Sequence, residues 1–324
     1  MDGHMHVLRD AIAAAVRAPS AHNSQPWRFE IEGDRLLLFA DYRRQLGAID
    51  REGRQLVMSC GCALFNARVA VLAWGHADIV TLDIVDDAHP DLVATLALGE
   101  RIVTSEVDLA LLLAIGKRRT YRGAFLPRPV SFTIADDLGE TAAFHGARFT
   151  RLDPVGKASL GELVERCDRL QFSDPEFRRD VEHWLTPFAS RRHDGIPFAI
   201  KEYGSRLPFT MQHTLRSPSL GQRFGELERE LINDAPLVVA LGTDSDDPLE
   251  WMRCGQALEA VLLHATHLGL SAAFVNQVLE VPELRSEVAR LTGLAYPQMI
   301  LRLGHPAENT GQRAPRRTLA EVLS

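Results

Sequence analysis

The sequence predicts an α+β protein made of two similar halves, on three observations. The segments "PWRFEI" and "RLLLFA" flank the turn Glu32–Asp34 and are typical of the two strands of a hairpin. The segment Arg54–Trp74 is long and apolar on most faces, which predicts a helix buried on nearly all sides. The pattern Met-x-Cys-Gly-x-Ala-Leu begins at Met58 and again at Met252, which favours an ancient duplication over chance similarity.

The first half is expected to cover residues 1–105. It opens with "VLRDAIAAAVR", whose apolar residues recur at helical intervals, and Pro19 stops this helix. The hairpin and the long apolar helix follow, and then "DIVTLDIV" alternates like a strand. The second half, residues 106–324, begins with a short helix at Val107–Ile115 that ends at Gly116.

The second half repeats this order around its copy of the apolar helix. The expected elements are a buried strand "APLVVALGT", a helix Pro248–Leu268, a strand "SAAFVNQ", a helix that begins at Val281 or Pro282, and a last strand "PQMILRLG". A segment without a clear period, Val181–Pro218, interrupts the half. It is either a disordered insert or an ordered lid, and its five aromatic residues favour the lid.

Composition excludes several classes of protein. The net charge of -7 over 324 residues argues against a nucleic-acid partner. No apolar run was expected to reach the roughly 20 residues of a membrane helix, and the start lacks the pattern of a secretory signal. The four cysteines form no paired framework, which predicts a reducing, cytoplasmic environment.

A cluster of cations follows the helix that ends at Gly116. Lys117, Arg118, Arg119 and Arg122 flank Thr120, and arginine forks with a hydroxyl suit a phosphate dianion. The alternative is a solvated basic end of a helix, which the helix dipole also favours. The C-terminal segment "QRAPRRTL" adds a second cluster with the same two interpretations, namely Arg313, Arg316 and Arg317.

Other chemical motifs are weak. His264 and His267 share a helix face but have no third ligand nearby, so core packing is favoured and no metal site is expected. Cys60 and Cys62 are expected to be core residues on different faces of their helix. No Ser-His-Asp arrangement, P-loop or G-x-G-x-x-G stands out, which ranks hydrolase and Rossmann-type functions low.

Three motifs together resemble the FMN-dependent nitroreductase superfamily. "PSAHNSQPWRF" is similar to its "PSxxNxQPWxF" signature, "RRTYRGAF" to its phosphate motif, and "PRRTLAEVL" to its C-terminal close. The phosphate motif follows the "PSxxN" motif here, whereas it precedes it in ordinary members. Together with "HDGIP" in the middle segment, this order resembles the Acg-type tandem branch.

The resemblance implies a fold and a stoichiometry. Two nitroreductase-like domains, each a mostly antiparallel sheet flanked by helices, would be fused as a pseudo-dimer with residues 181–218 as a lid. Each motif occurs once, because "LPRPVSFTIADD" stands where the second half would carry "PSxxN". The resemblance therefore implies one FMN per chain, and a monomer, since the usual partner is already part of the chain.

The resemblance also implies which residues bind FMN. Ribityl and ring contacts would come from the first motif, and phosphate contacts from both arginine clusters. Arg122 would be the cation near N1 and O2 of the flavin, and residues 278–281 would lie against the ring with a backbone N–H toward N5. The full set is Pro19, Ser20, Asn23, Gln25, Arg118, Arg119, Thr120, Arg122, Val278, Leu279, Glu280, Val281, Arg313, Arg316 and Arg317.

Two functions are compatible with such a site. An enzyme would take electrons from NAD(P)H and pass them to a nitroaromatic or a quinone on the same flavin face, with no catalytic side chain required. A binding protein would use the lid to close the cleft, and would store FMN or restrict its redox chemistry under stress. The length and place of the insert favour the second function, and the sequence leaves the electron acceptor and the choice of NADH or NADPH open.

Overall fold

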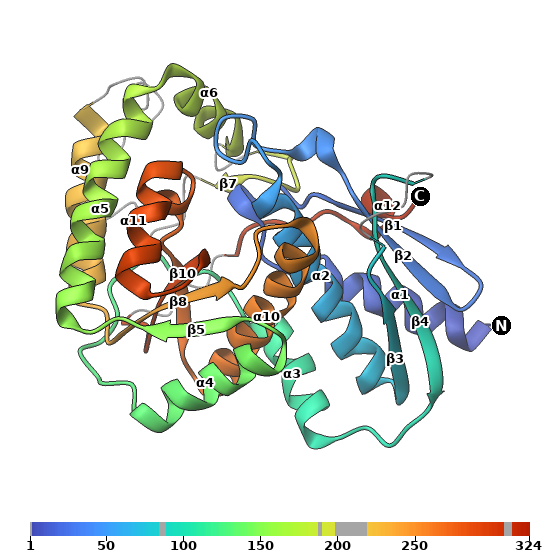
Figure 1. The fold of residues 1–324 in the computed structure, drawn as a ribbon. Helices are drawn as coiled ribbons and strands as arrows, with labels where there is room; N and C mark the ends of the chain where they lie inside the picture. Colours follow the sequence, from blue (N-terminus) through green and yellow to red (C-terminus); the bar gives the residue numbers. More distant parts are fainter. Residues whose placement is uncertain (1, 84–88, 187–189, 198–218, 308–312) are drawn as a thin grey trace.

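The computed structural model describes residues 2–83, 89–186, 190–197, 219–307 and 313–324. These residues form two four-stranded antiparallel sheets with helices around them (Figure 1). The first sheet has the order β1-β2-β4-β3 and consists of β1 (Trp27–Glu32), β2 (Arg35–Ala40), β3 (His76–Thr81) and β4 (Leu92–Arg101). The second has the order β5-β8-β10-β9 and consists of β5 (Arg148–Arg151), β8 (Leu237–Thr243), β9 (Ser271–Phe274) and β10 (Tyr296–Gly304).

The two sheets are built in the same way. In each, a long helix connects a central strand to the far edge strand: α2 (Arg54–Ala73) joins β2 to β3, and α10 (Pro248–His267) joins β8 to β9. A helix also precedes the first strand of each sheet, namely α1 (Asp2–Ala15) and α4 (Phe132–Phe144). The predicted α+β class and the repeated order of elements are therefore present in the structure.

The repeated sequence motif marks the place where α2 and α10 cross. A Cβ atom on Gly61 would lie 2.4 Å from the carbonyl oxygen of Met252, and one on Gly255 would lie 2.2 Å from that of Met58. Only glycine permits so close an approach of two backbones. Met58 and Gly61 hold the same motif positions as Met252 and Gly255, so the contact is reciprocal, as across a two-fold axis.

Helix ends follow local rules. The helix α3 (Glu106–Lys117) begins with a capping box in which Ser105 and Asp108 exchange hydrogen bonds. Asp247 caps α10, and Pro248 occupies the first turn, where a missing N–H costs nothing. The helix α11 (Pro282–Thr292) begins at one of the two residues predicted, and Gly293 ends it in the left-handed conformation.

A large insertion distinguishes the second half. β1 and β2 are joined by a tight turn at Gly33, whereas β5 and β8 are separated by α5 (Pro154–Ser173), α6 (Pro175–Trp184), β6 (Leu185–Thr186), β7 (Ile196–Pro197) and α9 (Ser219–Asn233). α5 and α9 pack closely, with Gly225 against the backbone of Glu165. The predicted lid, 181–218, is thus part of a longer insertion. The prediction of irregular structure is wrong for Val181–Trp184, which are helical. Residues 187–189 and 198–218 of the predicted lid lie outside the described part of the chain.

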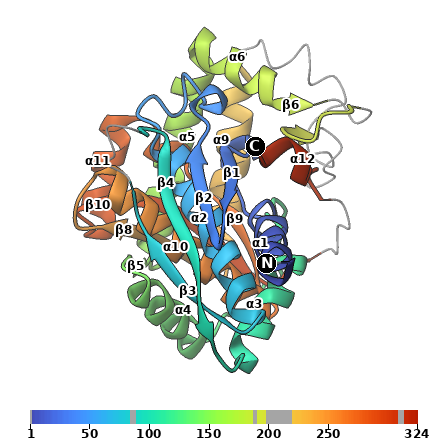
Figure 2. The same cartoon turned by 90° about the vertical axis from the view of Figure 1, so that its right-hand side faces the viewer.

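β-type pairing holds both ends of the second half. The short helix α12 (Leu319–Val322) lies beside β1 of the first half, where Leu323 pairs with Phe29 and the Ser324 N–H donates to the Phe29 carbonyl at 2.9 Å (Figure 2). Thr120, just after α3, pairs with Ala272 at the edge of the second sheet. The cation cluster of the tail is thereby attached to the first half, and the cluster after α3 to the sheet of its own half.

Several elements were not predicted, and one expectation was wrong. The strands β4 and β5 and the helices α4, α5, α6 and α9 have no counterpart among the predicted elements, and packing decides their position in the fold. The expectation that no apolar run reaches the length of a membrane helix is wrong, because α2 is long and apolar enough to cross a bilayer. However, 83% of its apolar stretch is buried inside the protein. It is a core helix, and its Cys60 and Cys62 contact different neighbours, the carbonyls of Pro26 and Gly255.

Candidate functional site

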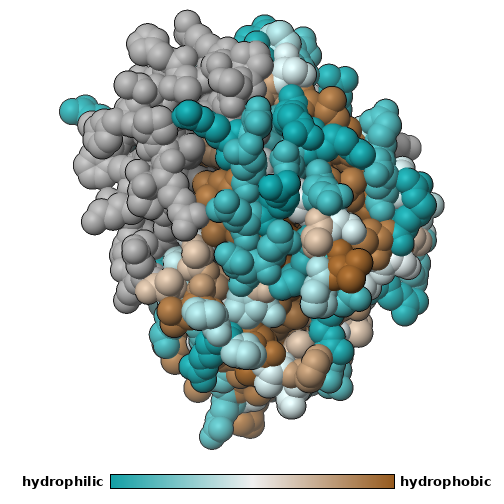
Figure 3. Space-filling view, turned by 90° about the vertical axis from the view of Figure 1, so that its left-hand side faces the viewer, coloured by the Kyte–Doolittle hydropathy of each residue, from teal (hydrophilic) through white to brown (hydrophobic). Residues whose placement is uncertain are grey.

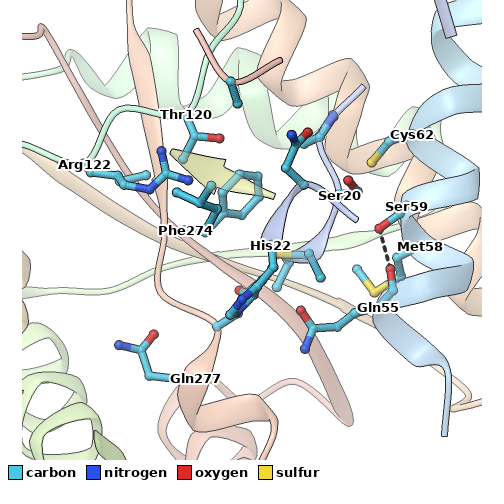
Figure 4. A pocket seen from close by; sticks show the side chains of 18 of the residues that line it. Ser20, His22, Gln55, Met58, Ser59, Cys62, Thr120, Arg122, Phe274 and Gln277 are labelled. Carbon is cyan, nitrogen blue, oxygen red and sulfur yellow. Dashed lines mark hydrogen bonds between the residues drawn. The ribbon is translucent and has the colours of Figure 1, made fainter. Parts of the chain in front are cut away.

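A cavity of about 380 Å³ lies between α2, the edge of the second sheet, the insertion and the C-terminal tail. In Figure 4, Thr120 and Arg122 lie on one side, Gln55, Met58 and Ser59 of α2 on the other, and His22 between them. Ten of the fifteen predicted residues line it: Pro19, Ser20, Asn23, Arg118, Arg119, Thr120, Arg122, Glu280, Arg313 and Arg316. Gln25, Val278, Leu279, Val281 and Arg317 are not among the lining residues.

The loop after α1 is strained and firmly held. His22, Asn23 and Gln25 have φ values of 49°, 55° and 51°, which side chains other than glycine rarely adopt. Such strain persists only where the surroundings fix it, and it is common at binding sites. Here the Ser20 hydroxyl accepts from the Gln25 N–H at 2.9 Å, and Asn23 Nδ2 donates to the carbonyls of Gly195 and Pro315 at 2.9 and 3.0 Å.

The "HDGIP" segment clamps this loop. The Gly195 N–H donates to the Asn23 carbonyl at 3.2 Å, and Gln25 Nε2 donates to the His193 carbonyl at 2.8 Å. Asp194 forms an ion pair with Arg44. The motif in the middle of the chain therefore positions the first motif, and it does so through backbone groups.

Gln25 of this loop and Arg317 of the C-terminal tail bind each other outside the cavity. Gln25 is fully buried, and its Oε1 accepts from the Arg317 N–H at 2.8 Å. Arg317 Nη1 donates to the carbonyls of Gln25 and Trp27 at 3.0 Å each. Their side chains stabilise the geometry of the site from outside the cavity.

The cationic end of the cavity combines both arginine clusters. Arg118 Nη2 donates to the Arg17 carbonyl at 2.9 Å, and Arg316 Nη1 donates to Asn23 Oδ1 at 2.9 Å. Within the described part of the chain, the buried Nε atoms of Arg118 and Arg316 have no hydrogen-bond acceptor. Burial, followed by the charge of Arg118, lowers the pKa of Arg316 to about 9. Two close guanidinium groups with unused N–H donors are suited to an anion.

Sequence reasoning missed Glu259, which faces these arginines from α10. It is fully buried, and its Oε1 lies 3.4 Å from Arg118 Nε. Burial raises the pKa of Glu259 to about 7, although the charge of Arg118 opposes the shift. The sequence does contain one signal for it: a charged residue interrupts the apolar run of α10, directly after the repeated motif, where α2 has Phe65.

The opposite end of the cavity is formed by the turn after β9. The Leu279 and Glu280 N–H groups donate to the carbonyls of Asn276 and Gln277 at 2.8 and 3.1 Å within a 3₁₀ turn. Val278 and Leu279 are buried in the core of the second half, with Val281 packed against it. Glu280 faces the cavity and accepts hydrogen bonds from Gln55 and Gln171, at 3.0 and 2.7 Å.

His22 projects toward the middle of the cavity (Figure 4). Burial, and then the charge of Arg122, lower the pKa of this imidazole to about 4. His22 is therefore neutral at physiological pH, and it adds a polar group without a charge between the two walls.

The insertion supplies much of the remaining wall. Its apolar contributors are Phe172, Phe177, Val181, Leu185, Ile196 and Phe224. The rings of Phe172 and Phe224 stack with centroids 5.5 Å apart and an interplanar angle of 11°. Sequence reasoning found the insertion but placed its start too late, because the lining residues of α5 and α6 belong to regular helices.

The equivalent region of the other half is filled. Between α1 and β1 the chain has an eleven-residue loop, 16–26, but α4 and β5 are joined by His145–Ala147 alone. The loop is therefore absent after α4, and not at "LPRPVSFTIADD", part of which begins that helix. The ring of His145 packs 4.9 Å from that of Phe65, and Arg68 bridges Gln256 and Asp78.

The expected core packing of the remaining histidine pair is wrong for His267, which is exposed, while His264 is half-buried. His264 Nδ1 lies 2.8 Å from the hydroxyl of Thr141 on α4. Among the residues that the structure describes, no group of three or more His, Cys, Asp and Glu side chains is arranged to hold a metal ion. All four cysteines are free and buried.

Comparison with known proteins identifies the family. The model of the nitroreductase family matches residues 172–305. Over 322 residues, the chain is 31% identical to "Putative NAD(P)H nitroreductase Rv3131" of Mycobacterium tuberculosis, which covers 98% of this chain and 90% of the relative. The chain therefore belongs to the nitroreductase family.

The relatives include the Acg protein. The chain is 29% identical to the NAD(P)H nitroreductase homologue acg of Mycobacterium tuberculosis over 337 residues, 98% of this chain and 95% of that one. Among solved structures, NfnB of Mycobacterium smegmatis in complex with NADPH covers 67% of this chain and 97% of its own, with 18% identity and a TM-score of 0.43. A Bacteroides fragilis nitroreductase with bound FMN covers 61% and 89%, with 20% identity and a TM-score of 0.37. Because these scores are low, membership rests on the sequence relatives.

Proposed function

We propose that this protein binds one FMN in the cavity between its two halves. The observation that carries the proposal is the convergence of three distant motifs on one cavity. Pro19, Ser20 and Asn23 meet the arginine cluster after α3 and the tail residues Arg313 and Arg316. The cavity volume lies in the range of small-molecule sites.

The residues present fit the phosphate of FMN. The unsatisfied Nε atoms of Arg118 and Arg316 offer charge-assisted hydrogen bonds to a dianion, next to the Thr120 hydroxyl and Arg119. Arg122 places a cation on the ring side, which would stabilise a negative charge on the pyrimidine end. Of residues 278–281, Glu280 lines the cavity and would contribute to the wall beside the ring. When bound, FMN would supply hydride transfer chemistry, for which no further catalytic side chain is required.

A fused pseudo-dimer explains why one site is expected. The reciprocal crossing at Gly61 and Gly255 is the contact that two identical subunits would make. The equivalent region of the other half lacks the "PSxxN" loop and contains packed side chains of Phe65, Arg68 and His145. We therefore propose one FMN per chain and a monomer. With four free, buried cysteines, we place the protein in the cytoplasm.

We propose a restricted role for the flavin: sequestration, or redox chemistry limited to small compounds. The insertion supports this, because α5, α6, β6, β7 and α9 all contribute side chains to the cavity wall. An active NAD(P)H-dependent oxidoreductase that reduces nitroaromatics or quinones is the second candidate, and the names of the sequence relatives favour it.

Two measurements test these proposals. Purified protein should be yellow and release one FMN per chain. A colourless protein, or two FMN per chain, would refute the single-site proposal. Under anaerobic conditions, NADH or NADPH should bleach the flavin slowly in the intact chain and faster in the variant F177A/V181A, which shortens two side chains of the insertion wall and leaves "HDGIP" intact. Fast bleaching of the intact chain would instead support the oxidoreductase.

A further inference from the structure

The insertion brings three polar side chains into the cavity that the FMN proposal does not use. Asp168 and Gln171 of α5 and Glu228 of α9 line the cavity, with 5%, 7% and 9% of their surface exposed. Asp168 Oδ2, Gln171 Oε1 and Glu228 Oε2 are buried and have no hydrogen-bond donor among the described residues. A carboxylate or amide oxygen accepts hydrogen bonds, and burying one without a donor costs about 1–3 kcal/mol.

Neighbouring groups leave these oxygen atoms for a ligand. Gln171 uses its Nε2 to donate to Glu280 at 2.7 Å, so its amide donor is already occupied. Arg302 Nη2 lies 4.0 Å from Glu228 Oε2, which is beyond hydrogen-bond distance. Burial raises the pKa of Asp168 well above its usual range, and the charges of Glu228 and Glu280 add to the shift. A hydrogen bond from Gln277 opposes the shift of Asp168, and Arg302 forms an ion pair with Glu228 without a hydrogen bond. This part of the cavity therefore has three acceptor atoms without a donor among the described residues.

Aromatic rings lie beside the acidic groups. Phe172 directly follows Gln171, and Phe224 precedes Glu228 by one helical turn. Their rings stack, and Phe177 adds an edge contact to Phe172 with centroids 5.3 Å apart. The wall thus combines flat apolar surfaces with acceptor atoms, which favours a ligand with an aromatic body and N–H donors.

We propose that this face of the insertion is a subsite for a small aromatic compound with a protonated amine. The subsite rests on the proposed function, because it shares the cavity assigned to FMN, and it names the class of ligand that would reach the flavin. An ammonium group supplies the N–H donors that the buried oxygen atoms of Asp168, Gln171 and Glu228 lack among the described residues. An anionic compound of the same shape meets acceptors and acidic groups and is disfavoured.

The same two helices provide a matched control. The face of the molecule over α5, α9 and α11 carries a broad hydrophilic band (Figure 3). Glu162 of α5 and Glu226 of α9 are exposed and lie outside the cavity lining. Exchanging these two for glutamine replaces two carboxyl groups by amides on the same helices, as the double variant D168N/E228Q does, without altering the cavity.

The test uses three probes that differ only in one substituent. 4-Nitrobenzylamine (cationic), 4-nitrobenzyl alcohol (neutral) and 4-nitrobenzoate (anionic) are titrated into the full chain loaded with FMN, and binding is measured by calorimetry. We expect the amine to bind roughly tenfold or more tightly than the benzoate, which equals about 1.4 kcal/mol. This preference should fall at least severalfold in D168N/E228Q and persist in E162Q/E226Q. The FMN content and the Tm of each variant are measured alongside.

The outcomes separate the two proposals. A chain that fails to retain FMN refutes the proposed function. A chain that retains FMN but binds the three probes equally, or prefers the benzoate, refutes the subsite alone. A preference for the amine that is lost equally in E162Q/E226Q also refutes the subsite, since it would then reflect the overall charge of the helices. If D168N/E228Q does not fold, the single variant Q171L provides the test, because it removes one acceptor without changing charge. It also removes the hydrogen bond to Glu280, and Q55L, which removes the other side-chain hydrogen bond to Glu280, is the control for that loss.

Discussion

Replacing Arg118 by alanine tests the phosphate end of the cavity. Arg118 is 7% exposed, and its Nε, which forms an ion pair with Glu259, has no hydrogen-bond acceptor among the described residues. One or two charge-assisted hydrogen bonds would be lost, each worth about 1.5–3 kcal/mol. The Kd for FMN should therefore rise by roughly 10-fold for one weak bond to roughly 20,000-fold for two strong ones, since 1.4 kcal/mol is a factor of ten.

The structure adds a complication that can be controlled. Removing Arg118 also deprives the buried Glu259 of its cation, which lies 3.4 Å away. Because the pKa of Glu259 is already raised to about 7, its carboxyl can take up a proton at a modest cost near neutral pH. The double variant R118A/E259Q separates the two effects, since the neutral amide removes the orphaned charge while the phosphate donors stay absent.

FMN affinity is measured by the quenching of flavin fluorescence on addition of the apoprotein, and Tm reports folding. We expect R118A and R118A/E259Q to lose FMN affinity to a similar extent, while the double variant regains stability above neutral pH. R118K keeps the charge but not the guanidinium fork and should be intermediate. Unchanged FMN affinity in R118A would refute the assignment of the phosphate site.

Three further predictions concern the fold and the loop. Gly255→Ala places a Cβ atom 2.2 Å from the Met58 carbonyl oxygen and should lower the free energy of unfolding in urea by at least about 1–3 kcal/mol. The control Gly116→Ala, with no atom within 4 Å of the new Cβ, should be neutral or stabilising. Equal effects of the two substitutions would contradict the close crossing of α2 and α10. The folded-state pKa of Glu259 is raised from 4.5 to about 7, so its contribution to stability is present below pH 4.5 and is lost as pH rises to about 7. The free energy of unfolding of the wild type should therefore fall over this pH range relative to that of E259Q. Parallel pH profiles of the two proteins in chemical denaturation would exclude the shift. Asn23→Ala removes hydrogen bonds to Gly195, Pro315 and Arg316 and should weaken FMN retention about tenfold or more, measured by ultrafiltration. Asn233→Ala at the exposed end of α9 should leave retention within about twofold, and equal retention in both variants would refute the role of the loop.

Much of the fold could be predicted because its signals are local. The hairpin of β1 and β2 depends on a turn and two strands that are adjacent in sequence, and the β-pairing follows from that. The apolar character of α2 and α10 predicts burial wherever they pack. β5 is four residues long and pairs with β8, which follows more than 80 residues later, so no local pattern could predict it.

The site, too, was predictable only where its signals are local in the sequence. The motifs at Pro19–Asn23, Arg118–Arg122 and Arg313–Arg317 could be read directly, and most of these residues line the cavity. Gln25 and Arg317 belong to the motifs but hold the loop from behind, a difference that depends on which way a side chain points. Glu259 could not be assigned from sequence, because its role arises from the position of α10 beside α3.

By itself, the sequence determined the α+β class, the repeated helix and the chemical character of the two cation clusters, because these depend on residue type and short-range spacing. Only the tertiary structure decided that Gly61 and Gly255 cross reciprocally, that Asp168, Gln171 and Glu228 share one cavity, and that the other half is filled. These features depend on contacts between residues tens to hundreds of positions apart. Such contacts form because two long helices and two sheet faces bury their apolar surfaces together, and no local pattern encodes which faces meet.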